Sequence, residues 1–222
     1  IGSIRSVLRE QRKEAEEKIW ANIAEGDKLI GEILDSNLRI KHLYAIEGHF
    51  AGRAETISSK EMERISQLKT ASTSLAVVEQ PHHSTPASAP SDMLSLALDG
   101  VQNPGNLGTI LRIADWFGID AVFATRDTVD VFNPKVVQAT MGAIFRVKFH
   151  YVDLPELSRC ILDAGGKVYG TFLDGGNMYQ RNLETGIASP VMIVIGNESE
   201  GISDTMAELV SDRLYIPPYP AD

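Results

Sequence analysis

Short apolar segments that alternate with helix-like segments make up most of the chain. In residues 93–222 the apolar segments predict strands at 93–101, 120–125, 146–152, 167–173, 190–196 and 213–217. Between them, residue patterns typical of helices predict helices at 107–118, 134–145, 154–165 and 203–210. Short strands in alternation with helices indicate the α/β class, with a mostly parallel sheet covered by helices on both faces.

Residues 1–80 show the same alternation on a smaller scale. Helices are predicted at 3–23, 26–37 and 58–68, with Ser58 capping the last, and strands at 40–46 and 74–80. Residues 81–92 are rich in proline and serine and predict a linker. We therefore expect a small α/β domain at 1–80 and a larger one at 93–222.

Composition adds few constraints. The chain has 222 residues, of which 43% are hydrophobic and 23% charged, as in ordinary globular proteins. No apolar run reaches the ~20 residues that span a bilayer, and the polar N-terminus does not fit a signal peptide. The single cysteine, Cys160, excludes an internal disulfide and fits a reducing cytoplasm. His82 and His83 lack further ligands at useful spacing, so no metal site is predicted.

The net charge of −9 by itself argues against a nucleic-acid partner. Residues 1–80 are nearly balanced in charge, however, and most of the acidic excess lies in residues 81–222. Two interpretations of the basic side chains in the first 80 residues stay open. They form either a cationic surface or a solvated face of ion pairs with interleaved glutamates.

A glycine-containing loop joins the first strand of the larger domain to its helix, in LDGVQNPGNLGTILR at 98–112. Its glycines do not have the spacing of a dinucleotide fingerprint, and no lysine follows them as a P-loop requires. Asn106 is expected to cap the helix, and Arg112 stands among apolar neighbours. From this stretch alone, a chemical role and a purely structural role for these two residues are both open.

A second unusual stretch is VMIVIGNESEGIS at 191–203, where an apolar strand leads directly into Gly196, Asn197 and Glu198. Ligands of open α/β sheets bind at the carboxyl ends of strands, so a binding site is possible here, as is a solvated turn. The stretch YIPPYPAD at 215–222 ends a strand and means little alone.

Taken together and in order, these stretches resemble the three motifs of the SpoU, or TrmH-like, family of RNA 2′-O-ribose methyltransferases in the SPOUT superfamily. Asn106, Gly108 and Arg112 match the first motif, and the Gly-Asn-Glu-x-x-Gly pattern of residues 196–201 matches the second. Segments before the linker, such as IAEGDKLIGEIL, resemble the small RNA-binding domain of the ribosomal-protein L30e type that many members carry.

The third motif departs from the family pattern. Pro218 stands where the family has Met, and the sequence reaches Asp222 before the stretch that opens the last helix in the family. We therefore expect the native chain to continue beyond this point. The resemblance implies that the last segment forms a deep trefoil knot, a rare exception among folds.

The resemblance implies transfer of a methyl group from S-adenosylmethionine to a ribose 2′-hydroxyl of ribosomal or transfer RNA. Arg112 would act on the hydroxyl. Because arginine stays protonated, electrostatic stabilisation of the developing alkoxide is physically simpler than a base role. Asn106 and Glu198 would position Arg112 and the hydroxyl, Glu198 through a charge-assisted pair. The alternative is a catalytically inactive RNA-binding protein of the same fold.

The resemblance also implies a cofactor pocket at strand ends, with Gly196 letting the ligand approach the main chain. The expected cofactor-binding residues are Thr171, Phe172, Leu173, Ile195, Gly196, Ile216 and Pro217. The candidate RNA-binding residues are Arg5, Arg9, Arg12, Lys13 and Lys28. Residues 174–177, DGGN, are predicted to form a turn. Members of the family work as homodimers, and Trp116 and Phe117 belong either to such an interface or to the core.

Overall fold

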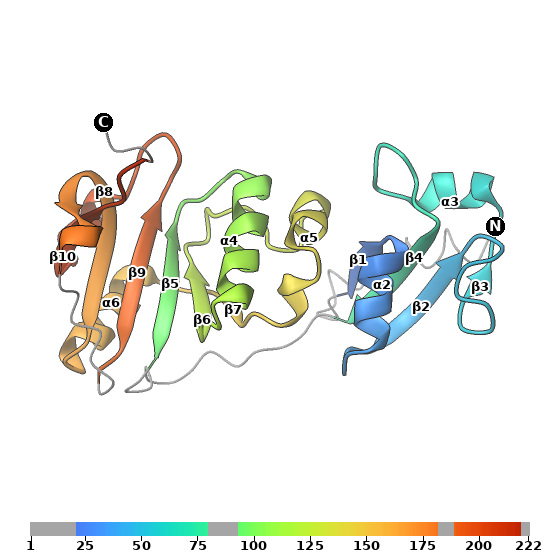
Figure 1. Cartoon of the computed structure of the whole chain (residues 1–222), viewed down its shortest axis with the longest axis horizontal. Helices are drawn as coiled ribbons and strands as arrows, with labels where there is room; N and C mark the ends of the chain where they lie inside the picture. Colours follow the sequence, from blue (N-terminus) through green and yellow to red (C-terminus); the bar gives the residue numbers. More distant parts are fainter. Residues whose placement is uncertain (1–20, 80–92, 182–188, 219–222) are drawn as a thin grey trace. The chain divides into compact units, whose positions relative to one another are not determined.

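The computed structural model describes residues 21–79, 93–181 and 189–218. Contacts within the chain divide it into two compact units (Figure 1). One contains the described residues 21–79 and 132–145, and the other contains 93–131, 146–181 and 189–218. Residues 132–145 thus group with the first unit although they fall inside the predicted domain 93–222. The predicted division into domains stays a prediction.

The first unit is built on a four-stranded sheet. Its elements are β1 (Ala21–Glu25), α2 (Asp27–Leu34), β2 (Ile40–Ala45), β3 (Glu55–Thr56), α3 (Ser59–Ile65), β4 (Ser74–Glu79), α5 (Pro134–Thr140) and the 3-10 helix η1 (Ala143–Phe145). The strand order is β1-β4-β2-β3, and β4 is antiparallel to both of its neighbours.

Strand β4 is buried because both of its faces are covered. Ala76 and Val78 belong to one apolar cluster together with Ile30 of α2. The alternate residues of β4 belong to a second cluster, on the other face, that includes Met62 of α3. A strand covered on both faces has to be apolar throughout, and this explains the unbroken apolar sequence of the segment.

Of two helices predicted in this unit, one ends differently in the structure and the other has the predicted cap. The predicted helix 3–23 is wrong at its end, because residues 21–25 form β1 and pair with β4; residues 3–20 lie outside the described residues. Helix α3 has the expected cap: Ser58 Oγ accepts a hydrogen bond from the Glu61 N–H at 3.3 Å. The Glu61 carboxylate in turn accepts one from the Ser58 N–H at 2.9 Å.

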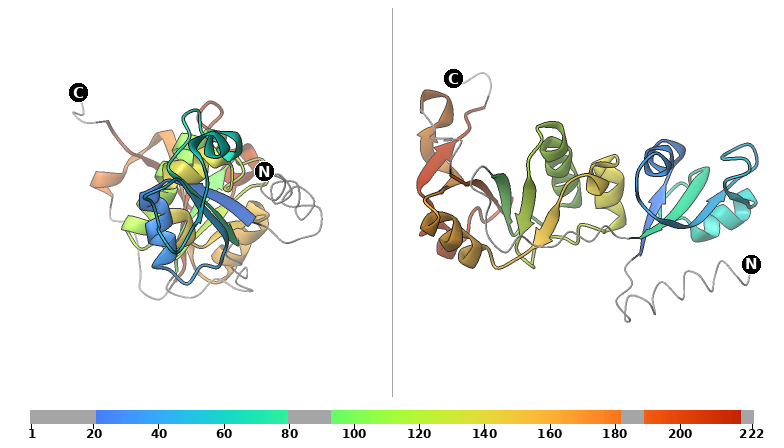
Figure 2. Two further views of the ribbon diagram at one scale, coloured as in Figure 1. Left: turned by 90° about the vertical axis from the view of Figure 1, so that its right-hand side faces the viewer. Right: turned by 90° about the horizontal axis from the view of Figure 1, so that it is seen from below.

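The second unit contains a six-stranded, fully parallel sheet in the order β10-β8-β9-β5-β6-β7. Helices α4 and α6 cover opposite faces of it (Figures 1 and 2). This confirms the predicted α/β class with a mostly parallel sheet. The elements are β5 (Leu94–Asp99), α4 (Pro104–Trp116), β6 (Ala121–Ala124), β7 (Phe149–Tyr151), α6 (Leu154–Asp163), β8 (Lys167–Asn177), η2 (Met178–Gln180), β9 (Val191–Gly196), α7 (Asp204–Ala207) and β10 (Asp212–Tyr215).

The helix predicted at 134–145 is interrupted. Helix α5 ends at Thr140, and Met141 and Gly142 take left-handed backbone conformations, with φ of 48° and 89°. The chain then forms η1. A left-handed residue ends the α-helical hydrogen-bond pattern, and glycine is well suited to this conformation, so the Met-Gly pair separates the two helical segments.

The turn predicted at 174–177 is wrong. These residues continue β8, which runs to Asn177 and pairs there with β10. A side chain at Gly175 would place its Cβ 2.5 Å from the backbone carbonyl carbon of Leu214. The glycine therefore permits close approach of two strands, a role that the turn-like sequence does not reveal.

Candidate functional site

The loops that follow β5 and β9 meet at the carboxyl end of the parallel sheet. The two strands are neighbours, and Asp99 pairs with Gly196 at their ends. From β5 the chain continues through α4 to β6, whereas from β9 it continues through α7 to β10, on the other side in the strand order. Such a reversal leaves a crevice beyond the strand ends, which is where open α/β sheets bind ligands.

Glu198 connects the β9 loop to the beginning of α4. Its carboxylate accepts hydrogen bonds from Asn106 Nδ2 at 2.9 Å and from the backbone N–H groups of Asn103 at 3.2 Å and Gln102 at 3.4 Å. A negative charge is favourable at a helix N-terminus. The two sequence motifs are therefore joined by one carboxylate.

The same contacts determine the protonation of Glu198. Partial burial raises the pKa of its carboxyl. Hydrogen bonds from its own backbone N–H, Asn106, Asn103 and Gln102 together lower this pKa by more than burial raises it. The net result is a pKa below the ordinary 4.5. A carboxylate with a lowered pKa is a weak proton acceptor at neutral pH, so Glu198 is suited to anchoring rather than to general-base catalysis.

The expected N-cap of α4 is corrected by the structure. The cap is Asn103, whose Oδ1 accepts hydrogen bonds from the N–H of Gly105 at 2.8 Å and of Asn106 at 3.2 Å. Pro104 follows at the first helical position, where its missing N–H costs nothing. The helix thus begins three residues earlier than predicted, and the side chain of Asn106 is free to bind Glu198.

Arg112 is exposed on α4, and within the described ranges it makes neither a hydrogen bond nor an ion pair. The expected pair with Glu198 is therefore not formed in this structure. Asn106 and Arg112 are six residues apart, so their side chains leave the helix in directions about 120° apart. Asn106 is oriented toward Glu198, while the guanidinium of Arg112 remains available to an anion from outside the protein.

Asn197 fixes the loop that follows β9. Its Nδ2 donates a hydrogen bond to the backbone oxygen of Gly100 at 2.7 Å. Its Oδ1 accepts hydrogen bonds from the N–H groups of Ser199 at 2.8 Å and Glu200 at 3.1 Å. The conformation of this loop is thus set by a side chain that also ties it to the loop after β5.

Gly196 lines the pocket described below, and it is also approached closely by the protein's own loop. Asn197 and Gly201 exchange two backbone hydrogen bonds, of 2.8 and 3.0 Å, which bring Gly201 across Gly196. A Cβ at Gly196 would lie 2.2 Å from the carbonyl carbon of Gly201. The close approach that requires glycine is therefore made by the protein's own loop.

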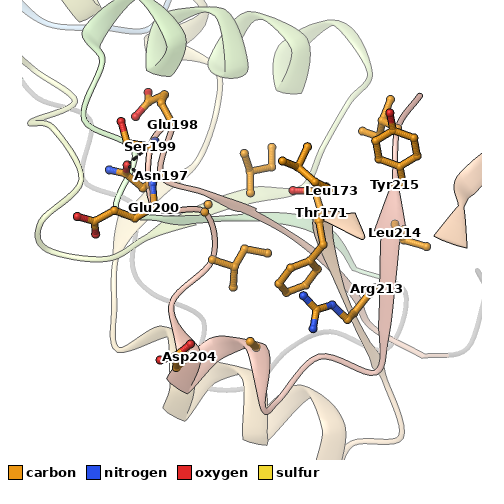
Figure 3. A pocket seen from close by; sticks show the side chains of 17 residues that line it. Thr171, Leu173, Asn197, Glu198, Ser199, Glu200, Asp204, Arg213, Leu214 and Tyr215 are labelled. Carbon is orange, nitrogen blue, oxygen red and sulfur yellow. Dashed lines mark hydrogen bonds between the residues drawn. The ribbon is translucent and has the colours of Figure 1, made fainter. Parts of the chain in front are cut away.

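A pocket of about 630 Å³ opens beside the middle of β8 and the carboxyl ends of β9 and β10 (Figure 3). Six of the seven predicted cofactor-binding residues line it, and Pro217 does not. Its volume, its backbone groups and its combination of apolar and charged side chains suit a charged cofactor of nucleoside size, so the residues present fit S-adenosylmethionine. The lining residues that were not predicted to bind the cofactor are Asn197, Glu198, Ser199, Glu200, Gly201, Ile202, Asp204, Ala207, Arg213, Leu214 and Tyr215, of which Glu198 was predicted as a catalytic residue.

Only some of these additional pocket residues could have been predicted from the sequence. Residues 197–201 belong to the second motif, so its position directly after β9 was a usable signal. Arg213 lies inside β10 and reaches the pocket because β10 pairs with β8, which no local pattern indicates.

The remaining candidates are those for the dimer interface and for RNA binding. Some are exposed in the structure, and the others lie outside the described residues. Trp116 is 85% and Phe117 73% exposed, so neither belongs to the core. Lys28 is exposed on α2 of the first unit. The other RNA-binding candidates, Arg5, Arg9, Arg12 and Lys13, lie outside the described residues.

Metal-ligand groups and membrane-spanning helices are both absent from the described part of the chain. Among these residues, no three His, Cys, Asp or Glu side chains are grouped as metal ligands would be. None of the helices described there has the length and apolar character that crossing a membrane requires.

Known RNA methyltransferases are similar to this chain in sequence. The sequence profile of the SpoU rRNA Methylase family matches residues 93–221. The 23S rRNA (guanosine(2553)-2′-O)-methyltransferase RlmP of Bacillus subtilis is 31% identical over 204 residues, which are 89% of this chain and 79% of the relative.

Solved structures of related proteins match the fold of nearly the whole chain. A Porphyromonas gingivalis protein assigned to the TrmH family of RNA methyltransferases is 37% identical. The match has a TM-score of 0.75 and covers 97% of this chain and 84% of the other. An AdoMet-bound rRNA methyltransferase from Sinorhizobium meliloti is 27% identical. Its TM-score is 0.76, and the match covers 96% of this chain and 84% of that one. The chain described here therefore belongs to the SpoU rRNA methylase family.

Proposed function

We propose that the protein transfers the methyl group of S-adenosylmethionine to a ribose 2′-hydroxyl of RNA. The observation that carries this proposal is the position of Glu198. It lines the cofactor-sized pocket and at the same time holds the start of α4, the helix that presents Arg112. Related proteins named as 2′-O-methyltransferases and an AdoMet-bound relative support it.

The chemistry of methyl transfer determines which task falls to the cofactor and which to the protein's side chains. When bound, S-adenosylmethionine supplies an electrophilic methyl group, so the protein has to orient a weak nucleophile and stabilise its developing negative charge. Arg112 is suited to both tasks, because a guanidinium can bind a phosphate of the RNA next to the reacting ribose and stabilise the developing alkoxide. Glu198 and Asn106 act on α4 and thereby on the position of Arg112.

We propose ribosomal RNA as the substrate class, supported by relatives that are named as rRNA methyltransferases. The five basic candidates of the N-terminal region would supply phosphate contacts. The trefoil knot and a cytoplasmic location remain predictions from the resemblance and from the sequence.

We also propose a homodimer that buries the apolar end of α4. Trp116, Phe117 and Ile113 are 85%, 73% and 48% exposed, and so many large apolar side chains on one short helix mark an interface. Replacing both Trp116 and Phe117 by Ser should convert the dimer to a monomer in light scattering coupled to gel filtration. An unchanged dimer mass in that double variant would refute this interface.

The decisive experiment for the activity is methyl transfer from radiolabelled S-adenosylmethionine. The full-length protein would be incubated separately with unmodified ribosomal RNA, with transfer RNA and with assembled ribosomal particles. Label in the ribosomal samples, followed by mapping to a 2′-O-methyl nucleotide, is the expected result. Label in transfer RNA alone would overturn the substrate class. Cofactor binding without label in any sample would favour the inactive RNA-binding protein.

A further inference from the structure

One cationic side chain of the described residues faces the pocket. Among its described lining residues, Arg213 is the only Lys or Arg, whereas Glu198, Glu200 and Asp204 supply three carboxylates. Figure 3 shows the carboxylates on the side of the loop between β9 and α7, with Arg213 reaching in from the opposite side. The pocket therefore has three carboxylates on one side and, on the other, one guanidinium that forms an ion pair with Asp174.

The guanidinium of Arg213 is held in place by two contacts. Its central carbon lies 3.8 Å from the centroid of the Phe172 ring, a cation–π arrangement, and Nη2 donates to Asp174 Oδ1 at 2.9 Å. The ring position depends on Gly170, because a Cβ there would lie 2.5 Å from a ring carbon of Phe172. A glycine, an aromatic ring and a guanidinium thus form one stack in the pocket wall.

Arg213 still has capacity to bind a ligand. A guanidinium carries five N–H donors, and the contact with Asp174 uses one of its nitrogens. Half of the Arg213 side chain is exposed. An anion entering the pocket can therefore reach the remaining donors while the stack on Phe172 keeps the guanidinium oriented.

The charges of the cofactor match this layout. At neutral pH the amino-acid part of S-adenosylmethionine has a cationic ammonium and an anionic carboxylate next to the cationic sulfonium. The carboxylate is repelled by the three acidic side chains and attracted by Arg213. We infer that Arg213 binds the carboxylate of the amino-acid part of the cofactor and selects for ligands that carry it. This inference rests on the proposed function.

The test separates carboxylate recognition from a purely structural role. The binding of S-adenosylmethionine and of decarboxylated S-adenosylmethionine would be measured by calorimetry for the full-length protein and for Arg213→Gln. Loss of a charge-assisted hydrogen bond weakens binding about tenfold or more. We expect this loss for S-adenosylmethionine and a change below about twofold for the decarboxylated ligand, since the carboxylate is absent there.

Two further variants sharpen the result. Arg159→Gln removes an exposed arginine of α6 that has no ion pair within the described residues, and it should change neither affinity. Arg213→Lys keeps the charge but not the planar donor set, so it should recover part of the affinity for S-adenosylmethionine.

The inference is overturned if Arg213→Gln weakens both ligands equally or weakens neither. A structural role predicts equal weakening, because a distorted wall or a smaller folded fraction affects both ligands alike. If the unaltered protein binds neither ligand, the proposed function itself fails and this inference falls with it.

Discussion

Replacing Gly196 by Ala tests whether the loop between β9 and α7 needs a residue without a side chain. The added Cβ would lie 2.2 Å from the carbonyl carbon of Gly201, 2.3 Å from the backbone nitrogen of Ile202 and 2.4 Å from the carbonyl oxygen of Gly201. All three atoms belong to the backbone, so no change of rotamer can relieve the contacts. The loop has to move away from the strand.

The cost follows from what that movement breaks. Overpacking typically costs about 1–3 kcal/mol. The two backbone hydrogen bonds between Asn197 and Gly201 contribute about 1 kcal/mol each. We therefore expect Gly196→Ala to lower the free energy of unfolding by about 3–5 kcal/mol. The same movement displaces lining residues of the pocket, so the affinity for S-adenosylmethionine should fall as well.

Urea unfolding, followed by circular dichroism, and calorimetric titration with S-adenosylmethionine measure the two effects. Gly31→Ala in α2 is the matched control, because a Cβ there meets nothing within 4 Å and alanine is favoured over glycine inside a helix. It should leave stability unchanged or raise it. If Gly196→Ala unfolds within about 0.5 kcal/mol of the unaltered protein and binds cofactor normally, the steric argument is refuted.

Three further predictions concern single side chains. Arg112→Ala should retain cofactor binding in calorimetry but lose about 10²–10³ in the rate of labelled methyl transfer, and an unaltered rate would remove Arg112 from the mechanism. Because hydrogen bonds lower the folded-state pKa of Glu198 below its ordinary value of 4.5, its contribution to stability is present above the ordinary pKa and is lost as pH falls through the folded value. The stability difference between the unaltered protein and Glu198→Gln should therefore shrink in urea titrations from pH 7 to about pH 3, and a difference independent of pH would contradict this. Ser58→Ala removes the cap of α3 and should cost about 1 kcal/mol in urea unfolding, whereas no loss would mean that the capping box is not stabilising.

Local pattern was sufficient for most of the elements. The apolar runs predicted β4, β5, β6 and β9, and turn and cap residues such as Ser58 and Gly118 marked helix ends. Two of the wrong predictions share one cause. Residues 21–25 look helical and residues 174–177 look like a turn, yet both are strands, because pairing with β4 and with β10 outweighs local preference.

For the candidate site, too, some features were predictable from the sequence and others depended on the tertiary structure. The sequence by itself determined the α/β class and the residues of both motifs, because alternating segments imply a parallel sheet and its strand ends carry the ligand-binding loops. Only the tertiary structure decided their partners: Glu198 binds Asn106 rather than Arg112, Gly196 accommodates Gly201, and Arg213 faces the pocket. The reason is physical. Asn106 and Glu198 are 92 positions apart, and the place of Arg213 depends on the pairing of β10 with β8, so both depend on strand order and register, which no short stretch of sequence encodes.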